Sequence, residues 1–309
     1  LARAHRSRGR HLITSATEHH AVLHAFEQLQ KNEGFEVTFL AVDVGGRIDP
    51  DELAAKIRPD TTLASVMAAN NETGVRQPLA EISNVCRARG VLLHSDMVQA
   101  FGKDEIDLSL VDAASFAAHK FYGPKGAGLL FLRAGVPISS IQFGGAHENE
   151  RRPGTENVAA IAGMAAAAEW ATSAINGEGQ REAELRDKLW NNIEAAVGGA
   201  QQNGDPAHRI ANTLNVSFPG LDSETILMAL DLEGVCASSG SACMVGSVVA
   251  SHVLLAMGAS PEIARSAIRF SLGRQTTADE IEAAGVAIAR TLQRLQRVSR
   301  TAPAHYAVV

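Results

Sequence analysis

The sequence predicts an α/β protein in which a mostly parallel, doubly wound sheet is followed by a smaller α+β domain. In the first half, short apolar runs typical of buried strands alternate with segments whose apolar residues recur at helical spacing. Short connections between them favour a parallel sheet with helices on both faces. The second half lacks this alternation. We place the change near Gly177, which gives a large domain at 1–177 and a small C-terminal domain at 178–309.

Local sequence signals predict where the helices and strands of the first half begin and end. Val22, Leu23 and Phe26 recur at helical spacing after a short apolar run. Asp49 or Asp51 is suited to cap the next helix, and Gly90 to end the one after it. We expect strands at 11–15, 35–42, 63–67, 91–93, 113–118 and 128–132, and helices at 20–32, 49–57, 79–89 and 159–174.

In the second half, Thr277 opens a capping-box-like start for the last helix. A Ser/Gly-rich segment at 237–247 predicts a mobile loop. We expect strands at 210–218 and 267–272, and helices at 180–196, 224–230, 250–257 and 278–297.

Composition excludes several classes of protein. The chain has 309 residues, 46% hydrophobic and 20% charged, so it has enough apolar residues for a sizeable core. A net charge of −6 argues against a nucleic-acid-binding surface. The longest apolar candidate, 159–171, is too short for a membrane span and contains Glu169.

The three cysteines form neither a metal-ligand spacing nor a disulfide framework, which favours a reducing, cytoplasmic compartment. The first ten residues are Arg-rich and free of acids, as in an organellar transit peptide. We favour a different interpretation, in which the chain begins inside a domain, within the tail of a helix.

The segment 113–125 is central to the functional prediction. An apolar run there ends in His119 and Lys120, and the chain then breaks at Gly123. Ligands of open α/β sheets bind at the carboxyl ends of strands. A partly desolvated lysine at such an end is able to form a Schiff base. The alternative is a solvated loop lysine.

Other polar residues follow strands at the same predicted edge. Asn71, Asp96 and Gln99 come after apolar runs, as Lys120 does. A lysine for an imine, an aspartate for a ring nitrogen and amides for a phenolate oxygen are the groups that pyridoxal phosphate needs. Taken alone, Asp96 is equally suited to cap a helix.

A histidine pair opens the helix after the first strand, at the same edge. His19 is placed to stack on a cofactor ring, or is simply a surface histidine at a helix start. In the second half, Arg269 lies inside a strand and needs an anion, which is either a substrate carboxylate or a structural acid.

Cys243 lies in the Ser/Gly-rich segment, which suits a nucleophile that enters a site, takes up an atom and carries it out. Cys236 sits in an apolar run and Cys86 on an amphipathic helix. We interpret both as structural.

Taken in order, the motifs resemble those of the NifS/IscS-like cysteine desulfurases, which are fold-type I, pyridoxal-phosphate-dependent enzymes of aminotransferase class V. They are TEHHAV (17–22), NNETG (70–74), HSDMVQ (94–99), AAHKFYGPKG (117–126), RRPGTEN (151–157), SSGSAC (238–243), SHVLLAMG (251–258) and IRFSLGR (268–274). SSGSAC resembles the branch that serves general or nitrogenase iron–sulfur assembly.

The resemblance implies a role for each matched residue around pyridoxal phosphate. Lys120 binds the cofactor as a Schiff base, and Asp96 pairs with its ring nitrogen. His19 stacks on the ring. Gln99 contacts the phenolate side, and His119 contributes to the phosphate site.

The remaining roles concern the substrate and the assembly. Asn71 contacts the phenolate and the substrate carboxylate, which Arg269 clamps. Thr155 reaches the phosphate of a neighbouring subunit, so a homodimer is implied. Cys243 takes sulfur from L-cysteine as a persulfide, alanine is released, and a sulfur-acceptor protein collects the sulfur.

Two departures from the family pattern stand out. Ala117 replaces a hydroxyl residue two places before His119, and so removes one phosphate hydrogen bond. The family's phosphate-binding Gly-Gly-Thr-Glu-type loop precedes TEHHAV and is absent from this chain. The alternatives are therefore a selenocysteine lyase or another class V lyase, and a truncated non-catalytic remnant or scaffold.

Overall fold

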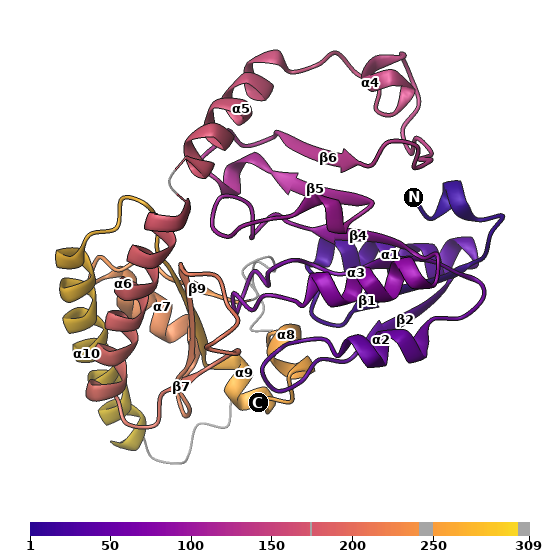
Figure 1. The fold of residues 1–309 in the computed structure, drawn as a ribbon. Helices are drawn as coiled ribbons and strands as arrows, with labels where there is room; N and C mark the ends of the chain where they lie inside the picture. The colour runs from indigo at the N-terminus through magenta and orange to yellow at the C-terminus, as the bar shows by residue number, and fades with distance from the viewer. Residues whose placement is uncertain (174, 241–249, 302–309) are drawn as a thin grey trace. The chain divides into compact units, whose positions relative to one another are not determined.

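The computed structural model describes residues 1–173, 175–240 and 250–301. It divides into two compact units (Figure 1). Unit 1 comprises Leu1–Asp43, Arg47–Asn70 and Val75–Ile175, and unit 2 comprises Val44–Gly46, Asn71–Gly74 and Asn176–Val309. The units separate at the start of helix α6 (Ile175–Ala196), so the predicted change near Gly177 lies inside that helix. The assignment of two domains stays a prediction.

Unit 1 contains a six-stranded sheet in the order β2-β1-β3-β4-β5-β6. Neighbouring strands are parallel, except that β6 runs antiparallel to β5 at the edge. This confirms the predicted mostly parallel α/β fold. The strands are β1 (His11–Ser15), β2 (Glu36–Leu40), β3 (Thr61–Ser65), β4 (Leu92–Asp96), β5 (Ala113–Ala117) and β6 (Gly128–Leu132).

The helices of unit 1 follow the expected signals. Asp49 caps α2 through its side chain, and the predicted Gly90, whose φ of 64° is left-handed, follows the end of α3. In α4, Glu148 and Asn149 also have left-handed backbone angles, so it is an irregular turn. The helices are α1 (His20–Glu33), α2 (Pro50–Lys56), α3 (Leu79–Ala88), α4 (His147–Glu150) and α5 (Val158–Thr172).

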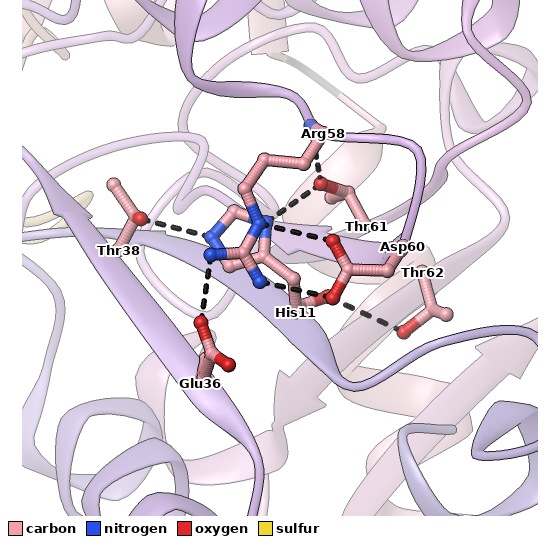
Figure 2. A network of polar contacts seen from close by, with 7 residues as sticks. All are labelled: His11, Glu36, Thr38, Arg58, Asp60, Thr61 and Thr62. Atoms are coloured by element: carbon pink, nitrogen blue, oxygen red, sulfur yellow. Dashed lines mark hydrogen bonds and ion pairs between the residues drawn. The ribbon is translucent and has the colours of Figure 1, made fainter.

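A histidine is buried at the amino edge of this sheet, where strands β1, β2 and β3 begin (Figure 2). The His11 ring lies 2.6 Å from Thr61 Oγ1 through Nδ1 and 2.9 Å from Thr38 Oγ1 through Nε2. Both ring nitrogens therefore have a hydroxyl partner. Burial lowers the pKa of His11, which favours the neutral ring.

Beside His11, an arginine connects the starts of these strands through ion pairs. Arg58 forms a two-pronged ion pair with Asp60, at 2.9 and 3.0 Å, and a further one with Glu36 at 2.7 Å. Both acids are substantially exposed, so these pairs contribute little stability individually. They do link the start of β2 to the turn before β3 (Figure 2).

Unit 2 contains a four-stranded antiparallel sheet in the order β7-β8-β10-β9. Thr277 and Glu280 form the expected capping box, with each side chain accepting from the other's backbone N–H. The remaining elements are β7 (Gln201–Gln202), β8 (Thr213–Ser217), β9 (Ser238–Ser239), β10 (Ala267–Ser271), α7 (Ser223–Asp231), α8 (His252–Ala256), α9 (Pro261–Arg265) and α10 (Ala278–Thr301).

An apolar core joins strands β8 and β10 of unit 2 to helices α6, α7 and α10. Leu214 and Val216 of β8 and Ile268 of β10 are fully buried, and Ile193 of α6 and Ile288 of α10 lie in the same cluster. The short elements β7, β9 and α9 were not expected from the sequence, because two to five residues are too few to show a periodic pattern.

In the described part of the chain, no individual helix has both the length and the apolar content to cross a bilayer. The segments Val158–Thr172 and Gly177–Ala196 reach that length and content only together, across a 75° bend.

Candidate active site

The lysine of the central segment lies at the end of β5, as predicted. After Ala117 the chain enters a short 3-10 helix, Ala118–Lys120, and the fully buried Ala118 accepts from the N–H of Gly123 at 2.9 Å. Phe121 is 1% exposed and fixes the far side of the turn. The backbone that carries Lys120 is therefore firmly held.

The predicted partial desolvation of Lys120 is wrong for this structure. Lys120 and His119 are both exposed. The reason is local: β5 ends at Ala117, and the following turn carries both side chains beyond the last strand residue, while Ala118 and Phe121 take the buried positions.

Asp96 is the last residue of β4 and is 9% exposed. Its Oδ1 accepts the N–H of Val98 at 2.9 Å. Burial raises the pKa of this carboxyl, while the Val98 hydrogen bond and the nearby His19 partly oppose the shift. A cation placed against Asp96 would therefore stabilise its charged form.

His19 caps α1, because its Nδ1 accepts the N–H of Ala21 at 3.1 Å. This is the helix-start role that the sequence left open. The side chain is half-buried and acts electrostatically on Asp96. Stacking of His19 on a cofactor ring stays a prediction.

Two amides were predicted to contact the phenolate side of a cofactor. Gln99 follows β4 in unit 1, and its Oε1 accepts from Lys103 Nζ at 2.8 Å. Asn71 belongs to unit 2. Its Oδ1 is buried and has no hydrogen-bond partner within the described residues, so the amide is available to a ligand.

The arginine predicted to clamp a carboxylate lies on β10, where it pairs with Asn215 of β8 and Ser238 of β9. Arg269 is half-buried, and its Nη1 donates to the carbonyl oxygen of Asn71 at 2.7 Å. Arg269 also acts electrostatically on Glu72. Both predicted anions, a substrate carboxylate and a structural acid, therefore stay open.

The cysteines differ sharply in environment. Cys243 lies outside the described residues. Cys86 is 1% exposed, and burial raises the pKa of its thiol to about 12, which confirms a structural role. Cys236 is exposed, so its predicted structural role is wrong. Its neighbours Val235 and Ala237 pack on the core of unit 2, and alternation along the extended chain turns Cys236 outward.

Thr155 is exposed in the loop before α5. Its predicted contact with a neighbouring subunit stays a prediction.

Two polar residues near Asp96 were missed, one fully buried and one half-buried. Glu18 is fully buried, and its Oε1 accepts the N–H of Met67 at 2.5 Å. Burial raises the pKa of Glu18 well above its usual value, and the charge of Asp96 adds to the effect. His94 lies between Ser65 Oγ and Ser115 Oγ, each 2.8 Å away, so it bridges β3 and β5.

A signal for both residues was present in the sequence. Glu18 follows a strand end, as Asp96 does, so the same argument about buried carboxylates applied to it. His94 precedes Asp96 by two residues on one strand and therefore lies on the same face of the sheet.

The residues of unit 1 fit pyridoxal phosphate. Asp96 supplies a buried acceptor that a protonated ring nitrogen would satisfy. β5 pairs with β4 and places Ser115 opposite Asp96, so Lys120 lies on the turn that ends the neighbouring strand. A carboxylate and an amine at adjacent strand ends match the two ends of the ring that the cofactor chemistry uses.

Comparison with known proteins extends this picture to most of the chain. Residues 1–284 match the family described as Aminotransferase class-V. The cysteine desulfurase IscS of Methanosarcina thermophila is 42% identical over 308 residues, covering 99% of this chain and 76% of the relative. A solved NifS-like protein has a TM-score of 0.88 at 36% identity and covers 95% of this chain and 78% of its own.

A further solved structure shows SspA in complex with cysteine. It is 30% identical, with a TM-score of 0.75, over 89% of this chain and 77% of that one. The chain therefore belongs to the aminotransferase class V family and is similar in sequence to cysteine desulfurases and in fold to a NifS-like protein.

Proposed function

Because the chain belongs to the aminotransferase class V family, we propose that its site takes sulfur from L-cysteine and hands it to an acceptor protein. The chain is a cysteine desulfurase and depends on pyridoxal phosphate, as this family does. The observation that carries the proposal is the pair of adjacent strands β4 and β5, which end in the buried Asp96 and in the turn bearing Lys120.

Each residue near the cofactor has a defined task. The amine of Lys120 holds the cofactor aldehyde, and Asp96 keeps a proton on the ring nitrogen. His19 supports the ring, Gln99 donates to the phenolate oxygen, and His119 contacts the phosphate. When bound, pyridoxal phosphate supplies a sink for the electrons of the substrate α-carbon.

Substrate binding and sulfur transfer fall to the other residues. Arg269 and Asn71 bind the carboxylate of L-cysteine. The thiolate of Cys243 attacks the substrate sulfur, so that a sulfur–sulfur bond forms as the carbon–sulfur bond breaks. The carbon keeps the electron pair and takes a proton, which yields L-alanine and a persulfide on Cys243. An acceptor protein of iron–sulfur or thio-cofactor assembly then removes that sulfur.

The proposal is tested by mixing the purified chain with pyridoxal phosphate and L-cysteine and measuring alanine and sulfide. We expect Lys120→Ala to abolish alanine release and Cys243→Ala to abolish sulfur transfer. Cys236→Ala is the matched control, because Cys236 is exposed and is expected to be dispensable. Full activity in Lys120→Ala would contradict the cofactor role, and sulfur transfer by Cys243→Ala would contradict the thiol role.

A second copy of the chain is the proposed partner in a homodimer, to whose cofactor phosphate Thr155 contributes. Large apolar side chains are exposed on α5 and β6 of unit 1, including Val158 at 71% and Ile161 at 49%. Helix α5 is apolar around its circumference, yet it buries few side chains in the chain itself. A face of this kind is typical of a protein interface.

The dimer is tested by light scattering after size-exclusion chromatography. We expect the double variant Val158→Asp, Ile161→Asp to shift the mass to that of one chain. Val286→Asp, at an exposed apolar position on α10, is the control and leaves the mass unchanged. Identical masses for all three proteins would contradict the proposed interface.

We place the enzyme in the cytoplasm. Cys86 and Cys236 are free thiols, and a reducing compartment maintains exposed thiols in that state.

A further inference from the structure

The tip of the NNETG motif is tied into unit 2 by its backbone. Asn215 Nδ2 donates to the carbonyl of Glu72 at 3.1 Å, and the carbonyl of Gly74 accepts from Ile210 at 2.9 Å. Arg269 holds the carbonyl of Asn71. These bonds fix the main chain on both sides of Glu72, whose side chain is 2% exposed.

The carboxylate of Glu72 meets Ser251, which lies two residues after the segment 241–249 and caps α8. Ser251 Oγ donates to Glu72 Oε2 at 2.5 Å, and the same hydroxyl accepts the N–H of Leu254 at 3.1 Å as the cap of α8. Ser251 is 2% exposed. Its hydroxyl therefore has a fixed orientation, with its proton on Glu72 and its oxygen facing the helix.

The same carboxylate meets the residue that precedes the segment. A Cβ atom on Gly240 would lie 2.0 Å from Glu72 Oε2 and 2.8 Å from Cδ. A flexible, exposed carboxylate would move aside at little energetic cost. Glu72 is buried and bonded to Ser251, so it has little room to do so. The glycine is thus required by close contact with Glu72.

We infer that Glu72 is a positioning residue that ties together the two ends of the segment carrying Cys243, by contact with Gly240 and by its hydrogen bond from Ser251. This inference rests on the proposed role of Cys243 as sulfur acceptor. β9, which leads into Gly240, pairs with β10 at Arg269. Glu72 therefore joins the base of the sulfur-carrying segment to the strand that bears the proposed carboxylate clamp.

The inference predicts that Glu72 fixes the base from which the Cys243 thiol reaches. The chain enters the segment at Gly240 and leaves it toward Ser251, and both ends meet at Oε2 of one carboxylate. The reach of the Cys243 thiol is then set from a fixed base. Loss of Glu72 would loosen that base without touching the residues that hold the cofactor in unit 1.

A double-mutant cycle tests the inference in a Cys236→Ala background, with Gly240→Ala, Glu72→Ala and the pair combined. The rate of Cys243 alkylation by iodoacetamide is measured by mass spectrometry in the folded protein, alongside the thermal midpoint. We expect Gly240→Ala to change the alkylation rate about tenfold when Glu72 is present and much less when it is Ala, because the clash is then absent. Independent, multiplicative effects on the rate would overturn the inference.

Conservative variants separate positioning from a general loss of stability. Glu72→Gln keeps the size of the side chain and an acceptor for Ser251, so its alkylation rate should stay within about twofold of the parent. Glu262→Ala, at an exposed acid of α9, is the control for loss of charge in unit 2. A Glu72→Gln variant as perturbed as Glu72→Ala would contradict the positioning role.

Activity distinguishes this inference from the proposed function. With pyridoxal phosphate and L-cysteine, Glu72→Ala should lower kcat for sulfur transfer about tenfold while the cofactor absorbance titration is unchanged. If the parent chain releases no alanine, the proposed function fails, yet the alkylation cycle still reports on Glu72. If the parent is active and the cycle shows no coupling, the inference alone fails.

Discussion

The two edges of the sheet in unit 1 treat their polar groups differently. At the amino edge, His11 has a hydroxyl on each ring nitrogen, and Arg58 is paired with two acids (Figure 2). At the carboxyl edge, Glu18 and Asp96 are buried carboxyls whose pKa values are raised by burial.

Structural and ligand-binding polar groups can be told apart by their partners. A buried group whose partners come from adjacent strands is already satisfied, and it stabilises the fold. A carboxyl that burial makes harder to ionise is stabilised in its charged form by a cation, and at Asp96 the proposed cation is the protonated ring nitrogen of the cofactor. The following predictions test that contrast, in order of decreasing effect.

The largest expected effect is at Asp96. Asp96→Asn removes the charge proposed to hold a proton on the cofactor ring nitrogen, so affinity for pyridoxal phosphate and alanine release should both fall about 100-fold. Absorbance titration and an alanine assay measure them. Asp112→Asn, at the amino edge, where Asp112 accepts from the N–H of Leu93, should lower stability and leave cofactor affinity unchanged. Equal losses of affinity in both variants would remove the contrast between edges.

The next prediction concerns pH at the carboxyl edge. The folded pKa of Glu18 is raised, so the folded chain holds this proton more tightly than the unfolded chain does. The resulting stabilisation is present below the unfolded value of 4.5 and is lost as pH rises toward the folded pKa.

Glu18→Gln removes this pH-dependent loss. Relative to the parent, the variant should therefore gain about 1–3 kcal/mol of unfolding free energy between pH 4.5 and pH 8. Thermal or urea unfolding at several pH values measures the difference. A parent and variant that respond to pH alike would show that Glu18 is not buried as a proton-bearing acid.

The amino edge should respond to pH with the opposite sign. The folded pKa of His11 lies below the unfolded value of 6.5, so the unfolded chain is protonated first as pH falls. Stability is full above pH 6.5 and is lost on acidification. The difference between the parent and His11→Gln should shift by about 1 kcal/mol from pH 7.5 to pH 5, measured by the same unfolding curves. A shift in the other direction would mean that His11 is charged in the fold.

The smallest expected effect is at Lys103. Its ammonium donates to Gln99 Oε1, and we expect this contact to orient the amide. Lys103→Met should weaken pyridoxal phosphate binding only about two- to fivefold, since one exchangeable hydrogen bond is lost. A loss as large as that of Asp96→Asn would show that Lys103 itself contacts the cofactor.

Local signals predicted the fold and part of the site. The end of β5 shortly before Lys120, the end of α3 before Gly90 and the capping box at Thr277 follow from short-range patterns, and the structure contains all three. Asp96 was predicted at the same edge because the apolar run 91–93 precedes it, and in the structure it is the last residue of β4.

The remainder depended on contacts that no local pattern encodes. Ser251 meets Glu72 across 179 positions of the chain, and Met67 meets Glu18 across 49. The exposure of Lys120 and of Cys236 was also missed. Each lies beside residues that are more apolar and that take the buried positions on the same short stretch of chain.

The turn that carries Lys120 has a consequence for how its amine reaches a carbonyl carbon. The main chain is pinned on either side, by Ala118 and by Phe121, so the lysine approaches by rotation about its own side-chain bonds alone. Capture of an aldehyde would then freeze one side chain, at an entropic cost of about 2 kcal/mol, and would leave the backbone as it stands.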